Sequence, residues 1–305
     1  MSGPISIAAI GEAMVELSLR PETPDRAGLG FAGDTLNTAI YLKRAAPEFE
    51  VAYVTRLGTD NLSDRMIEMI ASEGISTGLI GRDPSRAPGL YAISTDESGE
   101  RSFSYWRDTS AAKRLFSEEP PSIEALSGFT VIYASAISLA VISPEARSDL
   151  FRWLTGFRER GGRFAFDSNF RPALWPDRRT AQSEIEKAWR MADIGLPSVD
   201  DEMALFGDHN AEDVLTRLRE WGVSRGALKR GAHGPVAIDG SDAGPFATVR
   251  KVVDSTAAGD SFNAAYLAAH LEGRPERECL IAGHTLATRV IGVPGAILPR
   301  EQPGI

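Results

Sequence analysis

The sequence predicts a three-layer α/β/α domain with a mostly parallel central sheet and a small β-rich lid. Short apolar runs alternate with longer stretches of helical periodicity along most of the 305 residues. This alternation is typical of a parallel sheet covered by helices on both faces. Segments 12–33 and 89–107 interrupt the alternation, and we expect them to form the lid. The length suits one large α/β unit, so we expect a single domain over residues 1–305.

The predicted strands are short apolar runs, and the predicted helices are longer runs whose apolar residues recur at helical spacing. The strands fall at 5–10, 51–57, 131–137, 163–166, 194–197 and 226–229. The helices fall at 35–46, 62–73, 144–160, 180–191, 211–221, 260–271 and 276–291. Segment 12–33 is mostly a proline- and glycine-rich loop, and 89–107 is a β-hairpin with its turn at 96–99.

Bulk composition excludes several classes of function. Hydrophobic residues make up 43% and charged residues 25%, as in ordinary soluble proteins. The net charge of −9 argues against nucleic acid or an anionic membrane as a partner. The single cysteine, Cys279, excludes an internal disulfide and fits a reducing compartment. Neither a signal peptide nor an apolar run of ~20 residues is present, so we expect a cytoplasmic protein.

The stretch from Thr256 to Gly259 carries almost no side chain and leads directly into the helix predicted at 260–271. Its backbone N–H groups can therefore approach a ligand closely, and a helix N-terminus favours an anion. Asp260 stands in the first turn, where a carboxylate is available as a general base. On these residues alone, the stretch is either an anion site with an adjacent base or an ordinary helix start capped by Asp260.

Glycines at 28, 30 and 33 match the dinucleotide pattern G-x-G-x-x-G, but no buried strand precedes them. No Gly-Lys-Ser/Thr sequence occurs, which excludes a P-loop. Gly33 and Asp34 instead begin the helix predicted at 35–46, which also carries Asn37. They could contact sugar hydroxyls, or Asp34 could simply cap the helix.

Two further polar segments follow strands. Asn169 and Arg171 lie directly after the strand at 163–166, at the edge of a parallel sheet where ligands bind, although a plain turn would also use them. Lys229, Gly231 and Gly234 belong to a glycine-rich loop after the strand at 226–229.

Tyr91, Tyr105 and Arg107 lie on the predicted hairpin, where 105 and 107 share a face. A hairpin rich in Tyr, Trp and Arg could close over a ligand, extend the sheet edge or contact a second copy of the chain. A planar guanidinium suits a carboxylate, although an arginine at a strand end is most often a solvated charge.

Segment 254–260, Asp-Ser-Thr-Ala-Ala-Gly-Asp, resembles the C-terminal signature of the ribokinase-like (PfkB-type) carbohydrate kinases. Segment 31–39 resembles the N-terminal signature of the same family, and its Gly-Asp-Thr-Leu-Asn run is the form associated with 2-keto-3-deoxygluconate kinases. Ala32 departs from the pattern, since many relatives carry a second glycine there. The resemblance covers almost the whole chain. It implies a ribokinase-like fold, ATP and Mg²⁺, and phosphorylation of the 6-hydroxyl of 2-keto-3-deoxygluconate.

The resemblance also implies roles for individual residues. Asp260 would be the general base, and Ala257, Ala258 and Gly259 would form the anion hole. Residues expected to contact the sugar acid are Gly33, Asp34, Asn37, Tyr91, Tyr105, Arg107, Arg171 and Asp260. Residues expected near ATP are Asn169, Lys229, Gly231, Gly234 and Gly259. The family commonly carries Asn-x-x-Glu near the metal; here Val199 stands at the Asn position, and Glu202 is expected to reach the metal through water.

Two alternatives remain open. One is another sugar kinase of this family, such as a fructokinase, a ribokinase or a 5-dehydro-2-deoxygluconokinase. The other is a catalytically silent relative that binds a sugar acid and regulates, although the intact small-residue turn before Asp260 favours catalysis. The resemblance further implies a homo-oligomer formed through the lid.

Overall fold

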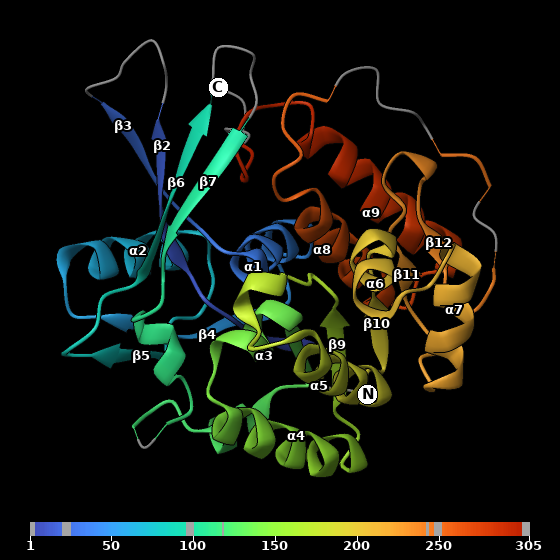
Figure 1. Ribbon diagram of the computed structural model, residues 1–305, viewed down its shortest axis with the longest axis horizontal. Coiled ribbons are helices and arrows are strands. Elements are labelled where there is room, and N and C mark those ends of the chain that lie inside the picture. Colours follow the sequence, from blue (N-terminus) through green and yellow to red (C-terminus); the bar gives the residue numbers. More distant parts are fainter. Residues whose placement is uncertain are drawn as a thin grey trace.

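A parallel sheet of six strands forms the centre of the computed structural model, which describes residues 4–19, 26–95, 101–117, 119–241, 244–246 and 252–300 (Figure 1). The strand order is β10-β9-β8-β1-β4-β5. The strands are β1 (Ser6–Ile10), β4 (Glu50–Gly58), β5 (Ile80–Asp83), β8 (Val131–Ser135), β9 (Arg163–Asp167) and β10 (Ile194–Leu196). The predicted fold class is confirmed.

Helices cover both faces of this sheet, as the alternation predicts (Figure 1). Successive residues of β1 point to opposite faces, so Ile7 and Ala9 belong to one core cluster and Ala8 and Ile10 to the other. The first face is covered by α1 (Asp34–Ala45), α2 (Asn61–Ser72), α8 (Ala258–Leu271) and α9 (Glu276–Val290). The second is covered by α3 (Ala136–Val141), α4 (Pro144–Glu159), α5 (Arg178–Met191), α6 (Val199–Phe206) and α7 (Ala211–Glu220).

Several helices begin at residues whose side chains cap them. Asp60 accepts hydrogen bonds from two backbone N–H groups at the start of α2, and Ser143 caps α4 directly before a proline at its first position. Asn210 caps α7 in the same way. At the other end of α6, Gly207 adopts a left-handed conformation that ends the helix. Local sequence thus sets these boundaries.

The strand predicted at 226–229 differs from expectation. Its central part, β11 (Ala227–Leu228), pairs antiparallel with β12 (Val236–Ala237), and the flanking residues Gly226 and Lys229 form isolated bridges to residues 195 and 198. Gly226 has a φ of 126°, and a Cβ there would lie 1.8 Å from the Gly195 carbonyl oxygen. This conformation and close approach turn the chain away from a regular ladder. The remaining short elements are 3₁₀ turns at Ala111–Arg114, Ile123–Gly128, Pro172–Leu174 and Gly231–His233.

A second, mixed sheet of four strands forms the lid (Figure 1). Its strands are β2 (Met14–Leu19), β3 (Ala27–Ala32), β6 (Gly89–Thr95) and β7 (Arg101–Trp106), in the order β3-β2-β6-β7. Strands β2 and β6 run parallel, and the two outer pairs are antiparallel. Residues 27–32, which were expected to belong to a proline- and glycine-rich loop, are therefore strand. The predicted hairpin turn at 96–99 and residues 20–25 lie outside the described residues.

Within the described ranges, no helix combines the length and the apolar character needed to cross a lipid bilayer.

Candidate active site

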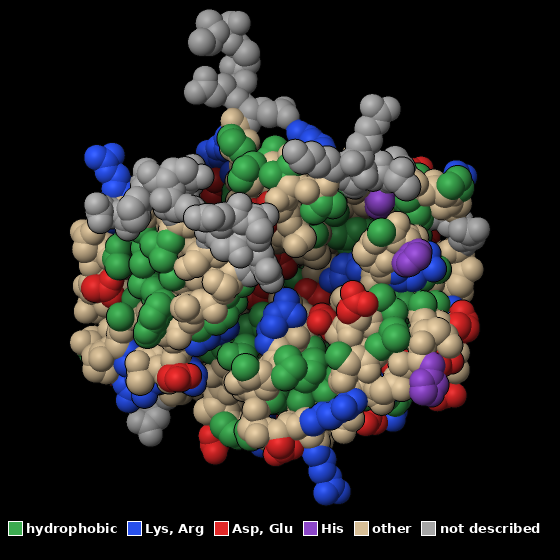
Figure 2. All heavy atoms as spheres, turned by 45° about the horizontal axis from the view of Figure 1, so that its top comes forward, with side chains coloured by type: hydrophobic (Ala, Val, Ile, Leu, Met, Phe, Trp, Pro, Cys, Tyr) green, Lys and Arg blue, Asp and Glu red, His purple; other side chains and the backbone are tan. Residues whose placement is uncertain are grey.

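Several of the predicted site residues lie where β1, β8 and β9 end and where α1 and α8 begin. Hydrogen bonds join these elements: Ser135 to Asp34 and Asn37 to Asp260. Ligands of open α/β sheets bind at this edge because the strand ends and helix N-termini meet there. Figure 2 shows that this face is hollowed, with acidic and basic side chains inside the hollow.

Asp260 is a buried carboxylate of the site, with 9% of its surface exposed. It lies in the first turn of α8, and its Oδ2 accepts a hydrogen bond from Asn37 Nδ2 at 2.8 Å. Burial raises the pKa of Asp260 well above its ordinary value, and the charge of Asp34 raises it further, whereas the bond from Asn37 and the charge of Lys229 oppose the shift. A fixed carboxylate with a raised pKa is suited to accept a proton near neutral pH.

The turn before Asp260 has the geometry of an anion site. Ala257 adopts a left-handed conformation, with φ 59° and ψ 16°, and the N–H of Ala258 donates to Ser255 O. Among the described residues, no acceptor is bonded to the N–H groups of Gly259 and Asp260. A Cβ on Gly259 would lie 3.8 Å from Lys229 Nζ. Unpaired donors at the N-terminus of a 14-residue helix, beside an ammonium group, favour a phosphate or a similar anion.

Asp34 is the first residue of α1 and is half-buried. Its Oδ2 accepts hydrogen bonds from Ser135 Oγ and from Asn169 Nδ2, the latter at 2.9 Å. Burial raises the pKa of Asp34, and these two donors oppose the shift. Gly33 precedes it in an extended conformation, and a Cβ there would lie 2.2 Å from Glu12 O. Asn169, which was expected near ATP, thus donates a hydrogen bond to Asp34, which was expected to contact the sugar.

Lys229 connects the end of strand β9 to helix α8. Its Nζ donates to Asp167 Oδ1 at 2.8 Å and to Asn263 Oδ1 at 2.9 Å. Gly231 and Gly234 flank the short turn that follows it, and a Cβ on Gly234 would lie 2.7 Å from the Phe246 ring. Sequence analysis did not single out Asn263, although its position one helical turn after Asp260 was a usable signal.

The lid residues have partners within the lid and at its base. The Tyr91 hydroxyl donates to Glu16, and the rings of Tyr91 and Tyr105 lie 5.8 Å apart, with Tyr105 54% exposed. Arg107 forms an ion pair with Glu12; the two side chains are 9% and 1% exposed. Burial raises the pKa of Glu12, and the charge of Arg107 opposes the shift. Sequence analysis missed Glu12, although it follows strand β1 at the site edge.

Arg171 and Glu202 have surroundings unlike those of the other predicted residues. Arg171 is 54% exposed, and its contact with Asp201 measures 3.5 Å. Glu202 points into the protein, where its carboxylate accepts from Trp189 Nε1 at 3.1 Å and from Arg217 Nη2 at 2.9 Å. Burial raises the pKa of Glu202 to about 7. The structure therefore does not bring Glu202 together with the other predicted residues.

Asp201, the neighbour of Glu202 in α6, faces the site instead. Its carboxylate lies 3.5 Å from Ser168 Oγ, and its pKa is raised by burial, lowered by the charge of Arg171 and raised by that of Asp167. Side chains at consecutive helix positions point about 100° apart. The sequence alone does not say which of Asp201 and Glu202 faces the site. Across the described ranges, no three His, Cys, Asp or Glu side chains are arranged to hold a metal ion.

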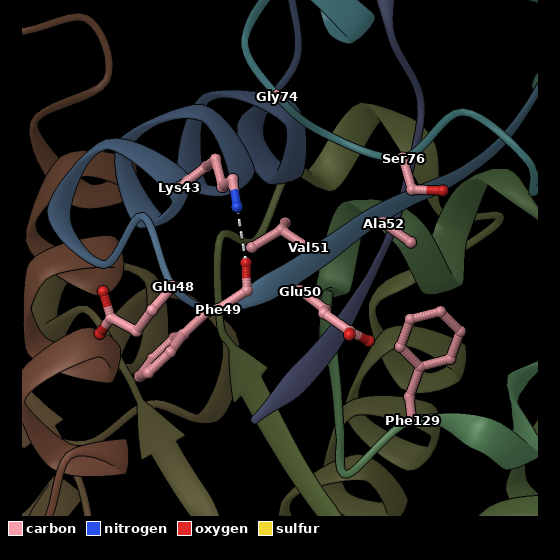
Figure 3. Close-up of a pocket in the computed structure, with 9 residues that line it drawn as sticks. All are labelled: Lys43, Glu48, Phe49, Glu50, Val51, Ala52, Gly74, Ser76 and Phe129. Atoms are coloured by element: carbon pink, nitrogen blue, oxygen red, sulfur yellow. Dashed lines mark hydrogen bonds between the residues drawn. The ribbon is translucent and has the colours of Figure 1, made fainter. Parts of the chain in front are cut away.

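A pocket of about 420 Å³ lies elsewhere, around the start of β4 (Figure 3). Lys43 reaches over it and donates to Phe49 O at 2.8 Å, the bond drawn as a dashed line. None of the predicted site residues lines this pocket.

The chain is similar to known proteins over almost its whole length. The chain is 43% identical to 2-dehydro-3-deoxygluconokinase of Escherichia coli K12 over 304 residues, 97% of each chain. The solved structure of 2-dehydro-3-deoxygluconokinase from Thermotoga maritima superposes with a TM-score of 0.80 at 20% identity, covering 96% of each chain. An Escherichia coli protein described as a ribokinase II, solved with ATP and Mg²⁺, superposes with a TM-score of 0.81 at 21% identity, covering 96% of this chain and 94% of that one. Residues 5–303 match the model of the pfkB family carbohydrate kinases, and the chain belongs to that family.

Proposed function

We propose that this chain transfers the γ-phosphoryl group of ATP to the 6-hydroxyl of 2-keto-3-deoxygluconate, which is 2-dehydro-3-deoxygluconate. One observation carries the proposal: Asp260 is buried and fixed by Asn37 beside N–H groups of the α8 turn that have no acceptor within the described ranges. A base beside an anion site is what phosphoryl transfer to a hydroxyl requires. The 43% identity to a 2-dehydro-3-deoxygluconokinase over nearly the whole chain supports this choice of substrate.

In the proposed mechanism the sugar oxygen attacks the γ-phosphorus of ATP, the bond to the β,γ-bridging oxygen breaks, and ADP leaves. Asp260 Oδ1 or Oδ2 accepts the hydroxyl proton as the new P–O bond forms. The N–H groups of Gly259 and Asp260, with the Lys229 ammonium, stabilise the charge on the transferring group. The lid, once closed over the sugar, excludes water that would otherwise hydrolyse ATP.

Mg²⁺ bound with ATP would supply positive charge that offsets the charge of the phosphates. Magnesium in such sites keeps several waters and takes few protein ligands, which agrees with the lack of a three-carboxylate cluster in the described part of the chain. Asp201 is the α6 carboxylate near Asp167 and Lys229, so we assign the water-mediated metal contact to Asp201. The oxygens of Glu202 accept bonds from Trp189 and Arg217 instead.

Recognition of an acid substrate requires a cation at the sugar site. Arg107 uses Nη2 to bind Glu12, but its buried Nε has no hydrogen-bond acceptor among the described residues. A guanidinium has five N–H donors, so Arg107 can hold Glu12 and a substrate carboxylate together. Arg171 is exposed, donates to Phe170 O at 2.9 Å and lies 3.5 Å from Asp201, and it would supply a second cation. Tyr91 and Tyr105 would contact the sugar from the lid.

The lid also supports the expected homo-oligomer. Leu29 and Trp106 lie on the same face of the lid sheet, since their strand partners Leu17 and Leu90 share it, and both are exposed. Exposed apolar side chains on one face of a sheet are suited to pack against a second copy of the chain. Light scattering of the purified protein would measure the assembly, and a monomer at micromolar concentration would contradict it.

The test of the function is turnover of a defined panel. With ATP and Mg²⁺, kcat/KM should be higher for 2-keto-3-deoxygluconate than for fructose, ribose or 5-dehydro-2-deoxygluconate. A preference for a neutral sugar would instead identify another sugar kinase. Binding of the acid without turnover would identify a silent regulator.

A further inference from the structure

A closed ring of hydrogen bonds holds the Lys229 side chain at the centre of the site. Its Nζ donates to Asp167 Oδ1 and to Asn263 Oδ1, and Asn263 Nδ2 donates to Asp167 Oδ2 at 2.9 Å. Asp167 and Asn263 are 2% and 0% exposed, so water does not compete for these bonds. An ammonium group has three N–H donors. In the part of the chain that the structure describes, two of them are occupied and one remains.

The ring ties the ammonium to the helix that carries the base. Asn263 lies on α8, three residues after Asp260. The position of a Cβ on Gly259, 3.8 Å from Lys229 Nζ, places the ammonium against the anion turn. Asn263 Nδ2 also lies 3.1 Å from Tyr133 OH, which extends the network towards α1. The ammonium is thus fixed relative to both the turn and the base.

We propose that Asp167 and Asn263 are positioning residues, which hold the Lys229 ammonium at the start of α8 so that its remaining N–H meets the transferring phosphoryl group. This inference rests on the proposed kinase function. Without the ring, a mobile lysine among several carboxylates would be free to pair with Asp260 and occupy the base. Because preorganised charge acts without rearrangement during the reaction, holding Lys229 in place favours the transition state.

A double-mutant cycle on kcat tests the proposal. Lys229→Met should lower kcat by about 10- to 150-fold, the value of one charge-assisted hydrogen bond. Asp167→Asn should lower it by about 10- to 100-fold, because a misplaced group costs up to ~10²-fold. In the Lys229→Met background, Asp167→Asn should change kcat by less than about threefold, since there is no ammonium left to position. Losses that multiply would overturn the proposal.

A pH profile separates positioning from a loss of structure. The charge of Asp167 raises the pKa of Asp260 and that of Lys229 lowers it, alongside the effects of Asp34 and Asn37. In the profile of kcat against pH, the acidic limb should therefore move to lower pH in Asp167→Asn and to higher pH in Lys229→Met. A general loss of folding would reduce amplitude without moving the limb. An acidic limb at the wild-type pH in both variants would count against the proposal.

A third variant and a binding measurement cover the case in which Asp167→Asn misfolds. Asn263→Leu keeps both charges, opens the ring and should lower kcat while leaving the KM for the sugar unchanged. Thr130→Val is the matched control, because it removes partly buried hydrogen bonds to Ser6 far from the site and should leave kcat unchanged. An Asn263→Leu enzyme with wild-type kcat would overturn the role of the ring.

The cycle can also be measured without turnover. Calorimetry with Mg²⁺ and a non-hydrolysable ATP analogue should give losses of affinity for Lys229→Met and Asp167→Asn that are not additive. Should the wild type phosphorylate none of the sugars, the proposed function fails, and this binding cycle still decides whether Asp167 acts through Lys229. Additive losses, or no binding of the analogue to the wild type, would refute positioning.

Discussion

Replacing Arg107 by alanine removes the partner of a carboxylate that is 1% exposed. Breaking a buried ion pair from one side costs about 3–5 kcal/mol, because the remaining charge is left without water or a counter-ion. For a chain of this size, roughly 2 °C of Tm corresponds to 1 kcal/mol. We therefore expect Arg107→Ala to lower Tm by about 6–10 °C.

Thermal and urea unfolding of matched variants would measure this loss. Arg190 provides the control, because its pair with Glu186 is exposed, at 52% and 38%. Arg190→Ala should cost less than about 1 kcal/mol. The double variant Glu12→Gln with Arg107→Met removes both charges, and it should recover most of the stability lost in Arg107→Ala.

The loss should also depend on pH in a defined direction. Burial already raises the pKa of Glu12 above its ordinary value of 4.5, and removing Arg107 raises it further. An acid whose folded pKa is raised contributes stability below its unfolded pKa, and that stability is lost as pH rises through the folded pKa. The deficit of Arg107→Ala should therefore be largest at neutral pH and shrink towards pH 4.5.

A deficit below about 1 kcal/mol, or one that does not change with pH, would refute a buried and uncompensated Glu12. The result also affects how substrate binding is measured. A higher KM in Arg107→Ala could reflect a disturbed lid base instead of a lost carboxylate contact. Only a rise in KM for the sugar acid that persists in the Glu12→Gln, Arg107→Met variant, with fructose unaffected, would support the contact.

Three further results are expected. Asp260→Asn should lower kcat by ~10²–10⁴-fold with little change in ATP affinity, and retention of more than about a tenth of wild-type kcat would show that Asp260 is not the base. Asn37→Leu removes a bond that lowers the pKa of Asp260, so the acidic limb of kcat should move to higher pH; an unmoved limb contradicts that coupling. The pKa of Glu202 is raised to about 7, so the protein should lose stability as the pH rises from about 4.5 to 7. In Glu202→Gln the urea midpoint should therefore vary less with pH over this range. A wild-type pH dependence in that variant would refute the assignment.

The central sheet and its covering helices were predictable because their apolar periodicity is local and their ends carry capping residues such as Asp60 and Ser143. Strand β3 was not predicted because glycines and exposed side chains, including Leu29, interrupt the expected alternation. A lid sheet that buries little apolar surface leaves a weak pattern. Periodicity therefore predicts the core more reliably than the lid.

The site was predictable as a set of segments and less so as a set of contacts. Asp34, Asn37 and Asp260 meet as the two signatures suggested. Glu12, however, is 95 residues from Arg107, and Asp167 is 62 residues from Lys229. Pairings over such separations depend on how the sheet is assembled, and no local pattern records them.

The left-handed conformation of Ala257 has a consequence for when the site is organised. Such a conformation costs a residue with a Cβ about 1–2 kcal/mol relative to right-handed backbone. The core that packs around Ala257, which is itself buried, supplies this energy once, as the chain folds. In the proposed mechanism, each catalytic cycle would then begin with donors already aimed, so the ligand would have no turn to reshape. Nucleotide affinity and turnover would in this way be coupled to the stability of the surrounding core, and a distant substitution that loosens this core should slow turnover before it unfolds the protein.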